Sequence, residues 1–246
     1  MSVKVGDKFT TNEGYEIEVL EYDVYKRVKI RFNTEFPSEK YVAVKEILKG
    51  NIKNPYHVTV RGVGFWGVGP YSSRNEDGTP IKEYIHWTSM LNRCYTEDYK
   101  KRFPTYVGCS VDRQWHNYQE FAEWCNWQVG FKDGYVLDKD ILVKGNKVYS
   151  PETCVLVPAE LNSLVVTQVK PGKDVPAGIS FQNGCQKYIV SCAIDGKNKN
   201  LGRYKCPEEA FAVYKEFKEN LIRERAEKYK DKMDIRAYHA LTNYVI

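Results

Sequence analysis

Residues 135–164 read YVLDKDILVKGNKVYSPETCVLVPAELNSL, and this stretch organises the centre of the chain. The brief apolar run at residues 137–141, which carries two acids, predicts a short strand, and Gly145-Asn146 and Pro151 predict turns after it. The sequence CVLV at 154–157 is typical of a short buried strand. Proline is tolerated in the first turn of a helix, so a helix is expected to begin near Pro158. The stretch therefore predicts a strand–loop–strand–helix unit.

Three parts of this unit carry a family resemblance: LDKD at 137–140, YSPETC at 149–154, and Glu160 with Asn162. They resemble the ββα-metal finger of the HNH endonucleases, in the degenerate form common in phage-encoded homing-endonuclease-like proteins. In active members of that family a histidine follows the first aspartate and acts as general base, and an asparagine orients it. A histidine or asparagine on the helix completes the metal site.

Two positions depart from the family pattern, because Lys139 stands at the histidine position and Thr153 at the asparagine position. The resemblance implies phosphodiester hydrolysis with Mg²⁺ held by Asp138 and Asn162, and with Asp140 as an extra oxygen donor. A lysine is protonated at pH 7 unless strongly desolvated, so Lys139 is able to hold a phosphate instead of acting as the base. The candidate catalytic residues are thus Asp138, Lys139, Asp140 and Asn162. The alternative is a purely structural finger without activity.

Residues 82–130 predict two aromatic helices ahead of the finger. The patterns W-x-x-M-x-x-R-C-Y at 87–95 and G-C-x-V at 108–111 resemble the segment that precedes the finger in the same phage proteins. Core packing is expected of the tryptophans in this segment, in preference to base stacking. These tryptophans are Trp87, Trp115, Trp124 and Trp127.

Other metal ligands or bases are less favoured by the sequence. The seven cysteines form no C-x-x-C pair, so a zinc ribbon or finger is unsupported. Convergence of Cys94, Cys109 and Cys154 on a metal is an alternative to three buried reduced thiols. His86 and His116 are candidates for a base from outside the finger, but a structural role is expected for each.

Composition and charge limit the function classes. The chain has 246 residues, of which 42% are hydrophobic and 28% charged, as in an ordinary globular protein. The polar start MSVKVGDKFTTNEG predicts no signal peptide, and no apolar run approaches the roughly 20 residues of a membrane span. Residues 171–205 carry six basic and two acidic side chains, which is expected of a contact with a polyanion.

The C-terminal part predicts a three-stranded antiparallel sheet after a linker at residues 165–176. Its strands are expected at residues 178–181, 188–194 and 200–204, because Asn-Gly and Asp-Gly turns separate them. A helix that begins at Pro207 is expected to pack its apolar stripe on one face of this sheet and to leave the other face free.

This part resembles the ethylene-response-factor (APETALA-type) DNA-binding domain over residues 176–222, through GI at 178–179, YIV at 188–190, LGRY at 201–204 and PEEAFAVY at 207–214. The resemblance implies that the sheet enters the major groove of duplex DNA. In the plant family that face is rich in arginine and tryptophan, so the loss of arginines here argues against strong, plant-like sequence specificity. A solvated sheet face is the alternative. The candidate DNA contacts are Ser180, Gln182, Lys187, Ser191, Lys197, Asn198, Lys199, Asn200 and Arg203.

The N-terminal residues 1–57 alternate apolar and polar side chains and predict a small antiparallel β unit, similar to a Src-homology-like barrel. The unit is expected to be a docking module for a protein partner or a spacer. The glycine-rich run RGVGFWGVGP at 61–70 lacks the Lys-Ser/Thr of a phosphate-cradling loop, so tight turns are favoured over nucleotide binding.

Together these patterns predict an α+β fold in three parts: a β-barrel-like module at 1–57, an HNH-like ββα unit with a helical lead-in at 58–170, and a DNA-binding domain with a helical tail at 171–246. The resemblances imply a phage protein of the host cytoplasm that binds and hydrolyses duplex DNA. The first alternative is a DNA-binding protein derived from such a nuclease without its activity. The second is a phage–host interaction protein that acts through residues 1–57.

Overall fold

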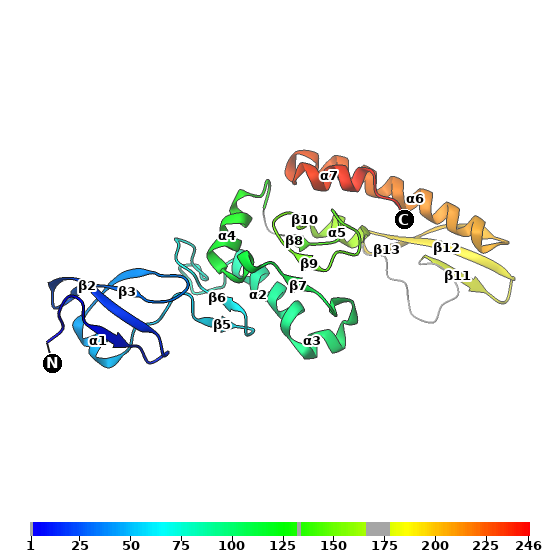
Figure 1. Cartoon of the computed structure of the whole chain (residues 1–246). Coiled ribbons are helices and arrows are strands. Elements are labelled where there is room, and N and C mark those ends of the chain that lie inside the picture. Colours follow the sequence, from blue (N-terminus) through cyan, green and yellow to red (C-terminus); the bar gives the residue numbers. More distant parts are fainter. Residues whose placement is uncertain (1, 132–133, 166–177) are drawn as a thin grey trace. The chain divides into compact units, whose positions relative to one another are not determined.

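The computed structural model describes residues 2–131, 134–165 and 178–246 (Figure 1). The chain is an α+β protein that divides into two compact units, Met1–Glu123 and Trp124–Ile246. Residues 166–176 of the expected linker, and the predicted boundary between residues 170 and 171, lie outside the described residues, whereas Val165 ends helix α5 (Ala159–Val165). Among the described residues, no helix is both long enough and apolar enough to cross a membrane.

The first unit begins with a four-stranded antiparallel sheet, in the order β1-β2-β3-β4. Every second side chain of β3 is buried, because successive side chains of a strand point to opposite faces. Helix α1 (Val44–Lys49) covers this buried face with Val44 and Ile47. The predicted N-terminal β unit is therefore confirmed as a sheet. Its strands are β1 (Lys8–Thr10), β2 (Glu16–Val24), β3 (Arg27–Phe32) and β4 (Glu39–Val42).

The rest of the first unit is built around aromatic side chains. Trp87 and Trp115 are fully buried, and the Trp87 indole N–H donates to the Trp115 carbonyl oxygen at 2.8 Å. Gly64 allows this packing, because a Cβ there would lie 2.6 Å from Leu91. The elements are β5 (Val58–Val60), β6 (Gly64–Phe65), α2 (Lys82–Tyr95), α3 (Glu97–Arg102), η1 (Pro104–Tyr106), β7 (Ser110–Val111), η2 (Arg113–His116) and α4 (Tyr118–Trp127), which runs across the boundary of the two units.

Core packing is the wrong expectation for one tryptophan of α4. Trp127 is 78% exposed, whereas Phe121 and Cys125 on the same helix are fully buried. Each residue advances about 100° around an α-helix, so Trp127 lies roughly half a turn away from Cys125. The aromatic run at the end of α4 therefore continues past the buried face of the helix.

The second unit begins with the predicted strand–loop–strand–helix order. Strands β8 (Tyr135–Asp138) and β10 (Val155–Pro158) pair antiparallel, with Val155 opposite Asp138. The short strand β9 (Val148–Tyr149) lies between them in sequence, and α5 (Ala159–Val165) follows β10 directly. Helix α5 packs against both β8 and β10. We refer to residues 135–165 as the finger.

The C-terminal sheet packs on helix α6 (Pro207–Lys228), as predicted. Its strands are antiparallel in the order β11-β12-β13. Figure 1 shows α6 running along this sheet. Val155 and Leu161 of the finger belong to the same buried cluster as Val190 of the sheet and Ile222 of α6. The remaining elements are β11 (Ile179–Gln182), β12 (Lys187–Ile194), β13 (Lys197–Tyr204), η3 (Lys230–Lys232) and α7 (Ile235–Thr242).

Candidate nucleic-acid interface

The C-terminal sheet has one face on α6 and one face turned away from it. Along β12, Val190 and Cys192 are buried in the core shared with α6, so the alternate residues Ile189, Ser191 and Ala193 lie on the opposite face. Residues that pair across neighbouring strands point to the same face of a sheet. The pairing with β12 therefore shows which residues of β11 and β13 belong to this face. We call this surface the open face. It consists of Ser180, Gln182, Lys187, Ile189, Ser191, Ala193, Asn198, Asn200 and Arg203, all exposed or half-buried.

A β-bulge determines which residues of β13 reach the open face. Ser191 pairs with Asn200, but Val190 pairs with Gly202, so the register shifts by one residue at Leu201. Without the bulge, Asn200 and Arg203 would point to opposite faces, because they are three residues apart. With it, Arg203 pairs with Ile189 and joins Asn200 on the open face.

Gly202 makes the bulge possible. Its φ of +124° is in a region that L side chains rarely adopt, and a Cβ there would lie 2.7 Å from the Tyr204 hydroxyl oxygen. The Gly202 N–H donates to Asn200 Oδ1 at 2.9 Å, and the Tyr204 hydroxyl donates to the Leu201 carbonyl oxygen at 2.9 Å. The side chains of Asn200 and Tyr204 therefore both support the bulged backbone.

The structure separates the predicted DNA contacts into two groups. Seven of the nine lie together on the open face, whereas Lys197 and Lys199 pair with Ile194 and Cys192 and so lie on the α6 side. The Lys199 ammonium sits over the Phe217 ring of α6, 4.9 Å from its centroid, as in a cation–π contact. Ile189 and Ala193 on the open face were not predicted as contacts, although a period of two through Val190 and Cys192 puts both on the face opposite to these two residues.

The open face is basic and polar. Lys187 and Arg203 make no ion pair with any described residue, and no aspartate or glutamate belongs to the open face. The nearest turn carries Asp195, whose carboxylate is 2.8 Å from Arg225 on the α6 side. Two unpaired cations among amide and hydroxyl groups give a surface that favours an anionic ligand with hydrogen-bonding groups.

The carboxylate of Asp138 shapes the loop of the finger. Its Oδ1 accepts the backbone N–H of Asp140 at 2.7 Å and that of Ile141 at 2.8 Å. Burial raises the pKa of Asp138, whereas these two hydrogen bonds act in the opposite direction. Asp138 therefore stabilises the loop that leaves β8, and its other oxygen is the one that remains for a ligand.

Lys139 is a buried structural residue. Lys139 is only 6% exposed. Its ammonium donates to Asp140 Oδ2 at 2.7 Å and to the Asn146 carbonyl oxygen at 2.6 Å. The Asn146 amide in turn donates to the Lys139 carbonyl oxygen at 2.9 Å and to that of Val148 at 2.7 Å. These bonds close the loop of the finger. They give no support to Lys139 as a general base or as a phosphate ligand.

Helix α5 contributes one oxygen with no evident structural role. Asn162 Oδ1 is buried and has no hydrogen-bond partner among the described residues. Glu160, in contrast, accepts from the Tyr229 hydroxyl at 2.7 Å and pairs with Arg225 at 2.8 Å, and so links α5 to α6. Amide and carboxylate oxygens are the ligands that Mg²⁺ prefers, so Asn162 and Asp138 are chemically suited to it.

The other candidate ligands and bases are buried or half-buried. Burial raises the pKa of the Cys154 thiol to about 12, so this thiol stays protonated at neutral pH. The ring of His116 is hydrogen-bonded to the Tyr95 hydroxyl at 3.2 Å, and burial lowers the pKa of both His116 and His86. In the described part of the chain, no three His, Cys, Asp or Glu side chains gather in a way that could hold a metal.

Comparisons with known proteins identify no relative: no protein-family model, curated protein or solved structure matches the chain. The function is therefore inferred from the surfaces described above, together with the two resemblances in the sequence.

Proposed function

We propose that this protein binds duplex DNA through the open face of its C-terminal sheet. The observation that carries the proposal is the bulge at Leu201 and Gly202, because it brings Arg203 onto the face that holds Lys187, Asn198 and Asn200. Antiparallel strands can enter the major groove, where arginine pairs with guanine edges and asparagine or glutamine with adenine edges. Lysine neutralises phosphates. The resemblance to the ethylene-response-factor domain supports the same mode.

The two groups of basic residues provide a charge-matched test. The variant Lys187→Ala/Arg203→Ala removes two cations from the open face, and Lys197→Ala/Lys199→Ala removes two cations from the α6 side. Fluorescence anisotropy with a mixed pool of labelled duplexes, titrated over a range of salt concentrations, measures affinity and salt dependence. We expect the first variant to lose affinity and to reduce the slope of log affinity against log salt by about 1 for each phosphate contact removed. Equal losses in the two variants would show that overall charge, and not the open face, controls binding.

The second candidate function is metal-dependent phosphodiester hydrolysis at the finger, favoured by the unpartnered Asn162 Oδ1. Asp138 and Asn162 would hold Mg²⁺, which supplies stabilisation of the charge that develops on the phosphate. Lys139 would keep the loop closed, and its bound ammonium leaves the finger without a base of its own. DNA binding without cleavage is therefore the function that the finger supports better. The resemblance to phage proteins implies that either activity would take place in the cytoplasm of a bacterial host.

A nicking assay separates these two candidates. Supercoiled plasmid is incubated with the protein and Mg²⁺ or Mn²⁺, with EDTA as the metal-free control. Asn162→Ala is the informative variant, because the Asn162 oxygen bonds to no described residue, whereas Asp138→Ala also breaks the loop. Metal-dependent nicking that Asn162→Ala abolishes supports hydrolysis at the finger. Nicking that the variant leaves undiminished contradicts this site.

A further inference from the structure

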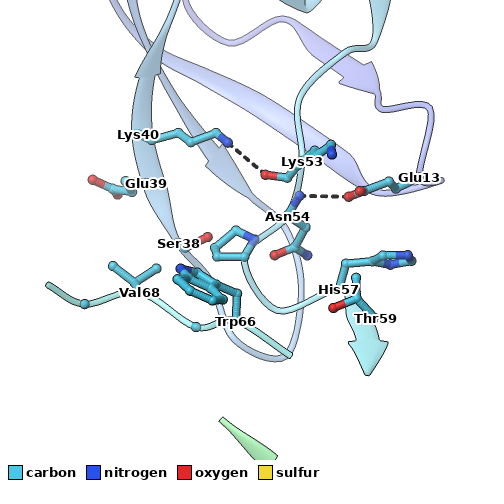
Figure 2. Close-up of a pocket in the computed structure, with 13 residues that line it drawn as sticks. Glu13, Ser38, Glu39, Lys40, Lys53, Asn54, His57, Thr59, Trp66 and Val68 are labelled. Atoms are coloured by element: carbon cyan, nitrogen blue, oxygen red, sulfur yellow. Dashed lines mark hydrogen bonds between the residues drawn. The ribbon is translucent and has the colours of Figure 1, made fainter. Parts of the chain in front are cut away.

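The first unit contains a pocket of about 490 Å³ that the proposed DNA interface does not use (Figure 2). It lies between the start of β4 and the segments around residues 53–59 and 66–69. Its size falls in the range of about 300–1,000 Å³ that is usual for small-molecule sites. Its lining includes the side chains of Glu13, Ser38, Glu39, Lys40, Lys53 and Trp66.

One wall of the pocket is the Trp66 side chain, which packs against other aromatic rings of the first unit. Trp66 is 37% exposed, and its ring lies 4.8 Å from that of Tyr118 at an interplanar angle of 32°. Tyr84 also packs near it, with ring centroids 6.3 Å apart. A tryptophan that is held by other rings and still partly exposed is a rigid platform on which a flat ring can stack.

A second part of the lining, at the start of β4, offers hydrogen-bond donors. Ser38 Oγ is buried and has no hydrogen-bond partner in the described part of the chain. The Lys40 ammonium donates to the Lys53 carbonyl oxygen at 2.8 Å, as Figure 2 shows, and burial lowers the pKa of Lys40. A buried hydroxyl without a partner and a desolvated ammonium both gain from a ligand that brings hydrogen-bond acceptors.

Two carboxylates and two ammonium groups line the pocket. The Glu13 carboxylate accepts the Asn54 backbone N–H at 2.8 Å, and the Glu39 carboxylate pairs with Lys29 at 3.0 Å. Neither Lys40 nor Lys53 makes an ion pair with a described residue. Glu39 is thus engaged by Lys29, whereas Glu13 keeps its charge and attracts the Lys40 ammonium, so Lys53 is the ammonium that remains for an anion.

We propose that this pocket binds a nucleotide, with the base stacked on Trp66 and the phosphate near Lys53. The site differs from a glycine-rich phosphate loop. Gly67 and Gly69 serve close packing instead, because a Cβ at Gly67 would clash with Asn117 and a Cβ at Gly69 with Gln119. The ligand is either a free nucleotide or an unpaired nucleotide of a single strand, since both present the same base and phosphate.

Isothermal titration calorimetry with AMP, adenosine and inorganic phosphate tests this site on the full chain. We expect AMP to bind more tightly than adenosine or phosphate, because only AMP engages both parts of the lining. Trp66→Leu is expected to weaken AMP binding by about tenfold or more, and Lys53→Ala to weaken AMP but not adenosine. The matched controls are Trp127→Leu, which removes the exposed tryptophan of α4, and Lys26→Ala, which removes an exposed lysine of the first unit.

Saturation-transfer NMR on the unaltered protein provides a second measurement if Trp66→Leu fails to fold. Stronger saturation of the base protons of AMP than of its ribose protons supports stacking. Displacement of AMP by the single strand dA5 identifies a nucleic-acid source, whereas failure of dA5 to displace it identifies the free nucleotide; either result supports the proposal. Phosphate binding as tightly as AMP, or equal AMP affinity in folded Trp66→Leu, would overturn it.

Discussion

The substitution Gly202→Ala tests whether the bulge of β13 is required by the fold. Alanine at a φ of +124° is strained by about 1–3 kcal/mol. The new Cβ would also meet the Tyr204 hydroxyl at 2.7 Å, and displacement of that hydroxyl breaks its bond to Leu201, which costs about 0.5–1.5 kcal/mol more. We therefore expect the free energy of unfolding of the second unit to fall by about 2–4 kcal/mol.

Urea denaturation followed by circular dichroism measures this loss. With a denaturant slope of about 2 kcal/mol/M, the midpoint of the second unit should fall by about 1–2 M. Gly184→Ala is the matched control, because a Cβ at Gly184 meets nothing within 4 Å and its φ is not positive. Equal midpoints for the two variants would refute the steric argument. A lower midpoint with unchanged DNA affinity, measured at urea concentrations below the transition, would show that the bulge stabilises the fold but is not needed for DNA binding.

Two further predictions concern the finger. Lys139→Met should lower the free energy of unfolding of the second unit by about 1–3 kcal/mol, because Asp140 and the Asn146 carbonyl oxygen lose their buried donor; an unchanged urea midpoint would contradict this role. The hydrogen bond from Tyr229, with help from Lys228 and Arg225, lowers the pKa of Glu160. The stabilisation that the charged Glu160 carboxylate gives to the fold should therefore be complete above its ordinary pKa of about 4.5. It should be lost as the pH falls through the lowered pKa. The urea midpoints of the unaltered protein and of Glu160→Gln should then converge on acidification, and a constant difference between pH 7 and pH 3 would argue against the coupling.

The C-terminal sheet was predictable from the sequence because the signals for its strands and turns lie within a few residues of one another. The Asn-Gly and Asp-Gly turns limit the strands, and Val190 and Cys192 stand two residues apart as expected of one buried face. The bulge is a shift of one residue, and alternation alone contains no sign of it. It is Arg203 whose face the bulge changes. The error at Lys199 has a different cause, because alternation alone puts Lys199 on the face opposite to Asn198 and Asn200, where it lies over Phe217.

The finger shows a second limit of sequence reasoning. The order of its strands and helix was predictable from apolar runs and turn residues, but the environment of Lys139 was not. A lysine between two aspartates is normally solvated, and only the closed loop brings the Asn146 carbonyl oxygen to its ammonium. The pocket beside Trp66 is similarly hidden, because its walls come from segments about 30 residues apart that meet only in the folded unit.

The shared core of the second unit bears on how the two candidate sites would work together. Val155 and Leu161 of the finger pack in the same cluster as Val190 of the sheet, and Glu160 ties α5 to α6 through Arg225 and Tyr229. Close-packed interiors transmit displacement instead of absorbing it, so the finger is held in a fixed position relative to the open face. A duplex bound on the sheet would therefore meet the finger at a constant distance along its backbone. If the finger cuts, the cut should fall at a fixed offset from the bound site; if it does not, the same rigidity makes the finger a brace that keeps the open face in shape.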